Sequence, residues 1–156
     1  MSDRANRVQR KLHRSQRNGN RSDKGGYYRR MRAARAQARV LVYSDKTGHA
    51  AHLANGLSRL GMRAVVVRTP LEAIVTLQDE SDPVQMAFVP LDSSNFNMAV
   101  FCAFLRDNHP RVRRMAFVTM STQLDAAVFA CSRQCDRVLC LPRKLDTIEY
   151  VLEAAL

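Results

Sequence analysis

The sequence predicts an α/β protein, a (βα)5 doubly wound parallel sheet preceded by a disordered basic tail. From residue 39 onward, short β-branched and apolar runs alternate with segments of helical periodicity. The chain has 156 residues, enough for one ordinary domain and an appendage. The formal charge of +11 arises entirely in the first quarter of the chain. We therefore expect two parts, a tail over 1–38 and a folded domain over 39–156.

The expected strands are short apolar runs of the kind found in the buried strands of a parallel sheet. They cover residues 39–43, 64–67, 86–89, 115–119 and 137–141. The expected helices follow at residues 47–60, 70–77, 97–106, 124–131 and 145–155. Right-handed crossovers between the parallel strands would place these helices on both faces of the sheet.

Helical spacing also predicts which side chains face the core. On the second expected helix these are Leu71, Ile74, Val75 and Leu77. On the fourth expected helix they are Leu124, Ala127, Val128 and Cys131.

The tail is basic and nearly devoid of apolar side chains, so it cannot offset its ordering entropy and is expected to be disordered alone. Residues 29–38 have high helix propensity, and a short helix there is compatible with the sequence. Arginine pairs bidentately with phosphate, so the tail predicts a polyanion partner. Nucleic acid, an acidic protein and anionic lipid all fit, because charge alone gives no preference among them. The candidate polyanion-binding residues are Arg4, Arg7, Arg10, Lys11, Arg14, Arg17, Arg21, Lys24, Arg29, Arg30, Arg32 and Arg35.

The four cysteines, Cys102, Cys131, Cys135 and Cys140, all lie in the neutral part of the chain among apolar residues. This pattern is typical of reduced, buried thiols, and we expect a cytoplasmic protein. Cys131 and Cys135 can share a helix face, yet no CxxC pair or neighbouring His supports a metal site, so core packing is expected. No apolar run has the length of a spanning helix, and the basic start lacks the apolar segment of a secretory signal.

From residue 40 onward the chain resembles the receiver domain of bacterial response regulators. Residues 61–73, GMRAVVVRTPLEA, are similar to its second strand and the start of its second helix. Residues 101–106, FCAFLR, fit its third helix, and residues 135–142, CDRVLCLP, resemble the stretch leading into its Lys-Pro pair. The resemblance implies a flavodoxin-like fold, with the functional pocket at the carboxyl ends of the strands.

In that family an aspartate after the third strand accepts a phosphoryl group and an acidic pair after the first strand holds Mg²⁺. A Ser or Thr after the fourth strand and a Lys after the fifth contact the phosphoryl group. By this resemblance the acceptor position falls on Pro90, the Lys position on Leu141, and the Ser/Thr position on Thr119 or Met120. Proline has no nucleophile and leucine has no cation. The resemblance therefore predicts a degenerate phosphoacceptor pocket, in a pseudo-receiver, made of Ser44, Asp45, Pro90, Asp92, Thr119, Met120 and Leu141.

The first functional hypothesis is a non-catalytic regulatory adaptor. Its receiver-like domain would bind a protein partner without phosphorylation, through the face formed by residues 124–155, which the resemblance implies. Its tail would engage nucleic acid or another polyanion. The acidic pair retains only Asp45, too few carboxylates for Mg²⁺, so neither a metal nor a cofactor is expected. The chain has no dinucleotide-binding or P-loop glycine pattern, and we predict no enzyme. A dimer is compatible with the sequence.

Two alternatives remain open. Asp92 lies two residues beyond Pro90, on the same side of an extended strand, so a conventional single-domain response regulator phosphorylated on Asp92 is one of them. Lys144 would then replace the missing lysine. The other is a nucleic-acid-binding protein that acts mainly through its basic tail, with the folded domain as a scaffold.

Overall fold

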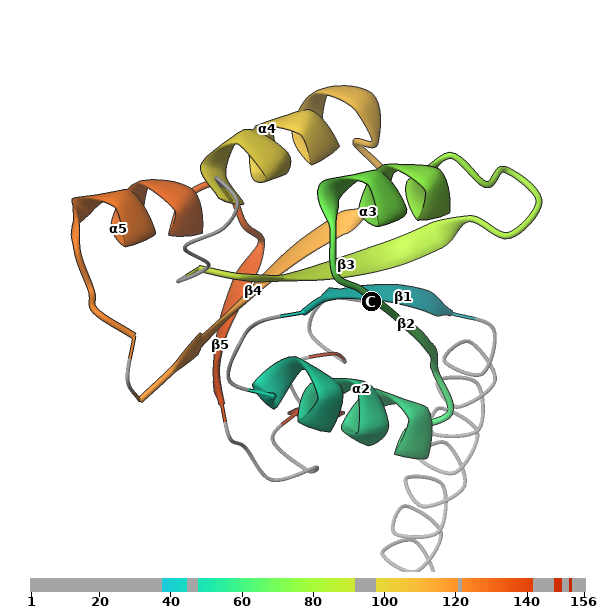
Figure 1. Ribbon diagram of the computed structural model, residues 1–156, viewed down its shortest axis with the longest axis horizontal. Helices are drawn as coiled ribbons and strands as arrows, with labels where there is room; N and C mark the ends of the chain where they lie inside the picture. Colours follow the sequence, from blue (N-terminus) through green and yellow to red (C-terminus); the bar gives the residue numbers. More distant parts are fainter. Residues whose placement is uncertain are drawn as a thin grey trace, which may run out of the picture. The chain divides into compact units, whose positions relative to one another are not determined.

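The five strands run through the apolar stretches of the sequence, and they form one parallel sheet (Figure 1). The computed structural model describes residues 38–44, 48–91, 98–120, 122–141, 148–149 and 152. The strand order is β2-β1-β3-β4-β5, and all four pairings are parallel. The predicted fold class is confirmed. The strands are β1 (Arg39–Tyr43), β2 (Arg63–Val67), β3 (Val84–Pro90), β4 (Arg113–Thr119) and β5 (Arg137–Leu141).

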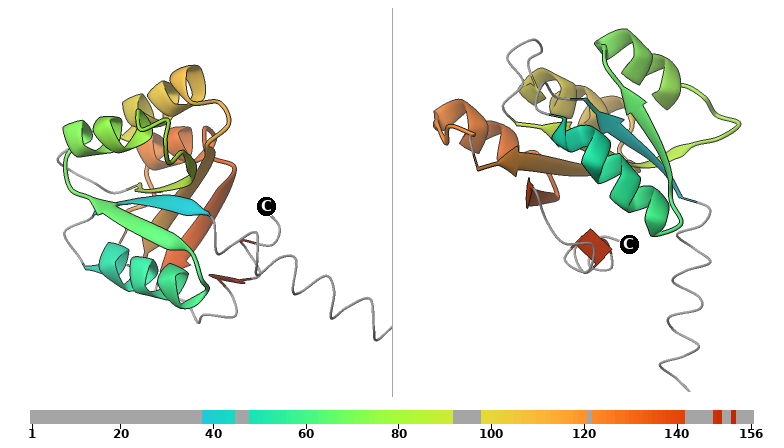
Figure 2. Two further views of the ribbon diagram at one scale, coloured as in Figure 1. Left: turned by 90° about the vertical axis from the view of Figure 1, so that its right-hand side faces the viewer. Right: turned by 60° about the horizontal axis from the view of Figure 1, so that its bottom comes forward.

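Helices cover both faces of the sheet, as the right-handed crossovers predict. Helices α3, α4 and α5 lie on one face, and α2 lies on the other (Figures 1 and 2). Of the last predicted helix, the structure describes Ile148, Glu149 and Leu152, all helical, with Ile148 and Leu152 buried beside α2 in one cluster. Of the predicted tail, the structure describes only Ala38, which is buried in the core; the predicted polyanion-binding residues lie outside the described residues. The bounds are α2 (His49–Arg59), α3 (Pro70–Leu77), α4 (Met98–Asn108) and α5 (Ala126–Ser132).

Side-chain caps and one glycine set where the helices begin. Thr69 caps α3: its hydroxyl accepts from the Glu72 N–H at 3.2 Å, while the Glu72 carboxylate accepts from the Arg68 N–H at 2.7 Å. Asp125 caps α5, accepting from the Val128 N–H at 2.9 Å. Before α2, Gly48 has a φ of 78°, a conformation that strains any side chain.

The core consists of two layers, one on each face of the sheet, because successive strand residues point to opposite faces. Val42, Phe88 and Phe117 belong to the layer beneath α2. Tyr43, Val89 and other alternate residues belong to the layer beneath α3, α4 and α5. Phe88 and Phe117 are the largest fully buried side chains that the structure describes.

Two helices bury fewer side chains than their sequences predict. On α3, Leu71 and Val75 are 71% and 61% exposed, while Ala73 and Leu77 face the core. Leu124 precedes α5 and is exposed, as is Ala127, so that helix contributes Val128 and Cys131 to the core. The predicted inward faces of these two helices were therefore partly wrong, because each is apolar on more than one side and so short that its spacing defines no single stripe.

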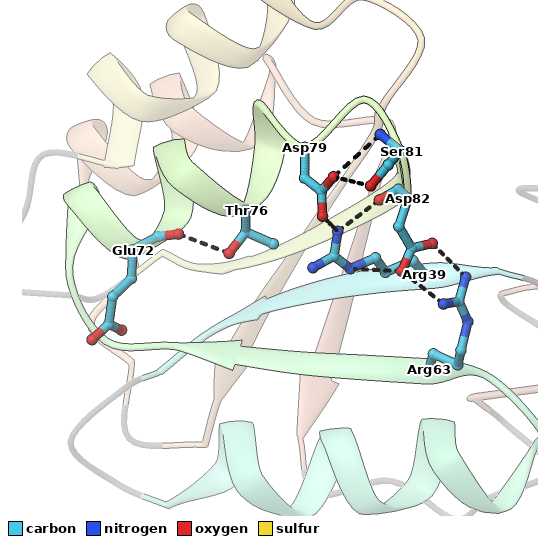
Figure 3. A network of polar contacts seen from close by, with 7 residues as sticks. All are labelled: Arg39, Arg63, Glu72, Thr76, Asp79, Ser81 and Asp82. Atoms are coloured by element: carbon cyan, nitrogen blue, oxygen red, sulfur yellow. Dashed lines mark hydrogen bonds and ion pairs between the residues drawn. The ribbon is translucent and has the colours of Figure 1, made fainter.

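An ion-pair network ties the amino-terminal ends of β1 and β2 to the turn before β3 (Figure 3). Arg63 donates to both carboxylate oxygens of Asp82 at 2.7 Å, and Arg39 donates to the Asp82 carbonyl at 2.6 Å. The Arg39 guanidinium also lies 3.3 Å from the Asp79 carboxylate. The hydrogen bond from Arg63 lowers the pKa of Asp82. Since Arg63 and both carboxylates are solvated, the network fixes geometry more than it adds stability.

Candidate functional site

The candidate site lies at the carboxyl ends of four strands. Ser44 follows β1, Pro90 ends β3, Thr119 ends β4 and Leu141 ends β5. Each lies two residues beyond a strand residue that belongs to the layer beneath α2, namely Val42, Phe88, Phe117 and Leu139. Because side chains along a strand point alternately to the two faces of the sheet, all four positions lie on the face that α2 covers. The strand order puts them in the sequence 44, 90, 119, 141 across the edge. The sheet therefore aligns these four predicted positions along one edge and on one face.

Pro90 ends the central strand of the sheet without interrupting its hydrogen bonding. It is buried and pairs in register with Phe117, and the next residue, Leu91, donates its N–H to the Phe117 carbonyl at 3.1 Å. Backbone nitrogens of successive strand residues point to opposite sides, so the Pro90 nitrogen points away from β4 and toward β1. The pairing of β1 with β3 ends at Val42 and Phe88, before Pro90 is reached. A residue without an N–H is therefore tolerated at this strand end.

Thr119 and Met120 have different environments. Thr119 is 5% exposed and lies beside Leu141 in the register of β4 and β5. Its N–H donates to the Thr122 hydroxyl at 2.8 Å, and the two hydroxyl oxygens are 3.4 Å apart. Met120 is 86% exposed in the turn that follows. Of the two candidates that the sequence left open, Thr119 is the one that lies among the strand ends.

Leu141 is fully buried and belongs to the apolar layer beneath α2. Leu139, Ile148 and Leu152 lie in the same buried cluster. An ammonium group within this cluster would lose its hydration, which costs several kcal/mol unless a partner compensates, about as much as the stability of many domains. The carboxyl end of β5 is thus built for an aliphatic side chain.

The remaining predicted residues are only partly described. Ser44 is half-buried, and its N–H donates to the Val67 carbonyl at 2.7 Å, extending the pairing of β1 with β2. Asp45, Asp92 and Lys144 lie outside the described residues. Within the part of the chain that the structure describes, no group of three His, Cys, Asp or Glu residues is arranged to hold a metal ion. None of the described helices is long and apolar enough to cross a membrane.

Three of the eight exposed large apolar side chains that the structure describes lie in α5, just before it, or in β5. Phe129 on α5 is 54% exposed and Val138 on β5 is 46% exposed. Leu124, just before α5, is 63% exposed. All three fall within residues 124–155, the face that the resemblance implies for a partner. Helical spacing predicts that Leu124 faces the core, and this prediction is wrong. Its exposure could therefore not have been found from the spacing of apolar residues.

Three cysteines form a sulfur cluster that the sequence did not reveal. The Cys102 Sγ lies 3.9 Å from the Cys131 Sγ and 3.7 Å from the Cys135 Sγ. Cys135 does not share the helix of Cys131, because α5 ends at Ser132. Cys102 comes from α4, far away in the sequence, so no spacing rule could have found this group.

Comparisons with known proteins agree on the fold. No protein-family model and no curated protein matches the chain. Among solved structures, the receiver domain of a response regulator from Bermanella marisrubri matches with a TM-score of 0.60 and 18% identity, over 75% of this chain and 96% of that one. A response regulator from Burkholderia pseudomallei, solved with a phosphorylated aspartic acid, calcium and citrate, matches with a TM-score of 0.59 and 24% identity, over 76% and 66%.

NtrX from Brucella abortus, in complex with ATP, matches with a TM-score of 0.61 and 21% identity, over 76% of this chain and 26% of that one. The chain thus spans about a quarter of the length of NtrX and most of the length of the Bermanella domain. Identities this low establish the architecture alone. The folded part of this chain has the fold of response regulator receiver domains.

Proposed function

We propose that this protein is a non-catalytic regulatory adaptor. Its receiver-like domain binds a protein partner without phosphoryl transfer, and its arginine-rich tail engages nucleic acid or another polyanion. The observation that carries the proposal is the buried Pro90 at the end of β3, where receiver domains resembling this one have their phosphoacceptor aspartate. Phosphoryl transfer needs a nucleophilic oxygen at that point, and proline offers none.

The other strand ends support the same proposal. Leu141 is fully buried where the resemblance implies a lysine, so this position supplies no cation to a transferred phosphoryl group. Thr119 retains a hydroxyl, but it lies 3.4 Å from the Thr122 hydroxyl in the turn that closes β4. With neither nucleophile nor cation, these positions favour a structural role for the strand ends over a reactive one.

The exposed side chains of Leu124, Phe129 and Val138 support a protein partner. Exposed large apolar side chains are common at interaction sites, and aromatic rings contribute much of the binding energy there. In receiver domains, the face formed by the fourth helix, fifth strand and fifth helix is the usual contact surface. We place the partner of this protein on the corresponding face, residues 124–155.

Acetyl phosphate is expected to leave the protein unmodified. The full-length chain is incubated with acetyl phosphate and Mg²⁺, and its intact mass is measured against a conventional receiver domain treated in parallel. The conventional domain gains a phosphoryl group, whereas this chain does not, because position 90 has no carboxylate.

A phosphoryl group that appears on this chain and disappears in the Asp92→Ala variant would contradict the proposal and favour the conventional response regulator. The Asp107→Ala variant serves as the comparison, because it removes an exposed carboxylate near the end of α4 and leaves every residue of the predicted pocket in place.

Removal of residues 1–38 is expected to abolish binding to a polyanion such as a nucleic-acid duplex. The tail contains nearly half of the Lys and Arg residues, whereas the remainder of the chain is close to neutral. Binding by the full-length chain should weaken with salt, with a slope of about −0.9 per neutralised phosphate in a plot of log affinity against log salt concentration. Fluorescence anisotropy at several salt concentrations measures both effects. Equal affinity of the full-length and truncated chains, or a response independent of salt, would remove the tail from the proposal.

A further inference from the structure

The sulfur cluster connects two helices on one face of the sheet. Cys102 lies on α4, Cys131 lies on α5, and Cys135 lies in the bend between α5 and β5. Helices α4 and α5 run side by side on this face (Figure 1). The Cys102 Sγ lies within 3.9 Å of both other sulfur atoms and is therefore shared by two possible partners.

The three sulfurs differ in their access to solvent. Cys102 is fully buried and Cys131 is 3% exposed, whereas Cys135 is only partly buried. A small solute can therefore approach the cluster through Cys135. Reactive cysteines combine such partial exposure with neighbours that favour the thiolate.

The cluster can hold a thiolate. Hydrogen bonds from Cys102, and then from Cys135, lower the pKa of Cys131, while the contact with Cys131 raises the pKa of Cys102. For Cys135, the hydrogen bond with Cys102 lowers the pKa, but the hydrogen bond with Cys131 and burial together raise it above its ordinary value. The thiolate of the cluster therefore lies on Cys131, and Cys102 and Cys135 keep their protons. Arg114 adds a cation nearby: its Nε donates to the carbonyl of Gln134, the residue before Cys135, at 2.8 Å.

We propose that Cys102 and Cys135 form a redox-modification site that a hydroperoxide oxidises to an intramolecular disulfide. In the first step the Cys135 sulfur attacks the peroxide and the O–O bond breaks. Cys135 becomes a sulfenic acid, and its thiol proton leaves with the departing oxygen as an alcohol or water. In the second step the Cys102 sulfur attacks the Cys135 sulfur and the S–OH bond breaks. The hydroxide leaves with the thiol proton as water, so two sulfurs have given two electrons to one peroxide.

The position of Cys135 favours this bond. The two sulfurs are 3.7 Å apart, and a disulfide of about 2.05 Å requires them to approach by less than about 2 Å. Cys135 lies beyond the last residue of α5, and its N–H donates to the Ser132 carbonyl at 3.1 Å, so a shift of its backbone disturbs this turn hydrogen bond and none within the helix. Cys131 lies within that helix and moves less easily. The site does not depend on the adaptor role proposed above, since its chemistry needs no partner protein.

The folded full-length chain, oxidised with hydrogen peroxide, tests the site. The chain is then denatured in the presence of iodoacetamide, so that buried thiols are blocked as they become exposed, and peptides are mapped by mass spectrometry without reduction. We expect a Cys102–Cys135 bridged peptide in the unmodified sequence, in Cys140→Ser and in Cys131→Ser. It should be lost in Cys102→Ala and in Cys135→Ser. A dithiothreitol-reversible rise in Tm should accompany the bridge, because it links residues 33 positions apart.

The partly buried position of Cys135 makes Cys135→Ser the milder of the two disabling variants, so it remains informative if Cys102→Ala fails to fold. Circular dichroism of each variant establishes that the domain is intact before oxidation. A bridge that contains Cys140, a bridge between two molecules, or Cys102 and Cys135 thiols that remain fully alkylated after peroxide treatment would overturn the proposal.

Discussion

Lysine at position 141 is expected to destabilise the domain by about 3 kcal/mol or more. Leu141 is fully buried, and its cluster holds Leu139, Ile148 and Leu152. The substitution removes an aliphatic side chain from this layer and forces an ammonium group either to lose its hydration or to displace neighbours to reach solvent. It introduces the residue that the family resemblance implies here, so the result tests whether this strand end accommodates a cation.

Leu141→Met is the matched control. Methionine is also unbranched at Cβ, has nearly the volume of leucine and carries no charge, so a loss below about 1.5 kcal/mol is expected. Urea unfolding followed by circular dichroism gives both free energies of unfolding under the same conditions. If Leu141→Lys were as stable as Leu141→Met, the strand end would accommodate an ammonium group. The apolar reading of the site would then be wrong.

The alternation of strands and helices was predictable because burial leaves a strong local pattern. A strand covered on both faces needs an uninterrupted apolar run, and the predicted bounds of β1 and β5 agree with the structure to the residue. Strand β3 extends beyond its predicted run, from Val84 to Pro90. Its extension at the carboxyl end depends on the pairing of Pro90 with Phe117, a contact that a local pattern does not contain.

Helix orientation was less predictable, because a short helix with several apolar residues offers more than one possible inner face. On α3, Leu71 and Val75 form one stripe, and Ala73 and Leu77 form another. The structure buries the second stripe, although its alanine is the smaller side chain. The local pattern does not distinguish the two stripes, because the choice depends on how the helix packs against the sheet in the tertiary fold.

The candidate site was also predictable only in part. The order of the strand ends follows from the fold, so Pro90, Thr119 and Leu141 could be assigned to one edge from the sequence. The choice between Thr119 and Met120 needed the register of β4 with β5. The sulfur cluster needed the packing of α4 against α5, which brings together cysteines 29 and 33 residues apart.

Phenylalanine-to-alanine substitutions at positions 117 and 129 are expected to lower the free energy of unfolding by very different amounts. Phe117 is fully buried in β4, beside Pro90 in the register, and its removal leaves a cavity in the layer beneath α2. We expect Phe117→Ala to lower the free energy of unfolding by about 3–5 kcal/mol. Phe129 is 54% exposed on α5, so Phe129→Ala should cost about 1 kcal/mol or less, because alanine is also the better helix former.

Urea unfolding of the two variants beside the unmodified chain measures this contrast, and the shared substitution chemistry makes each the control for the other. A small loss at Phe129 would mean that its ring is dispensable for folding and is available for contact with a partner. Equal losses at the two positions would instead mean that Phe129 is buried in solution. The surface assigned to the partner would then lack its largest apolar side chain.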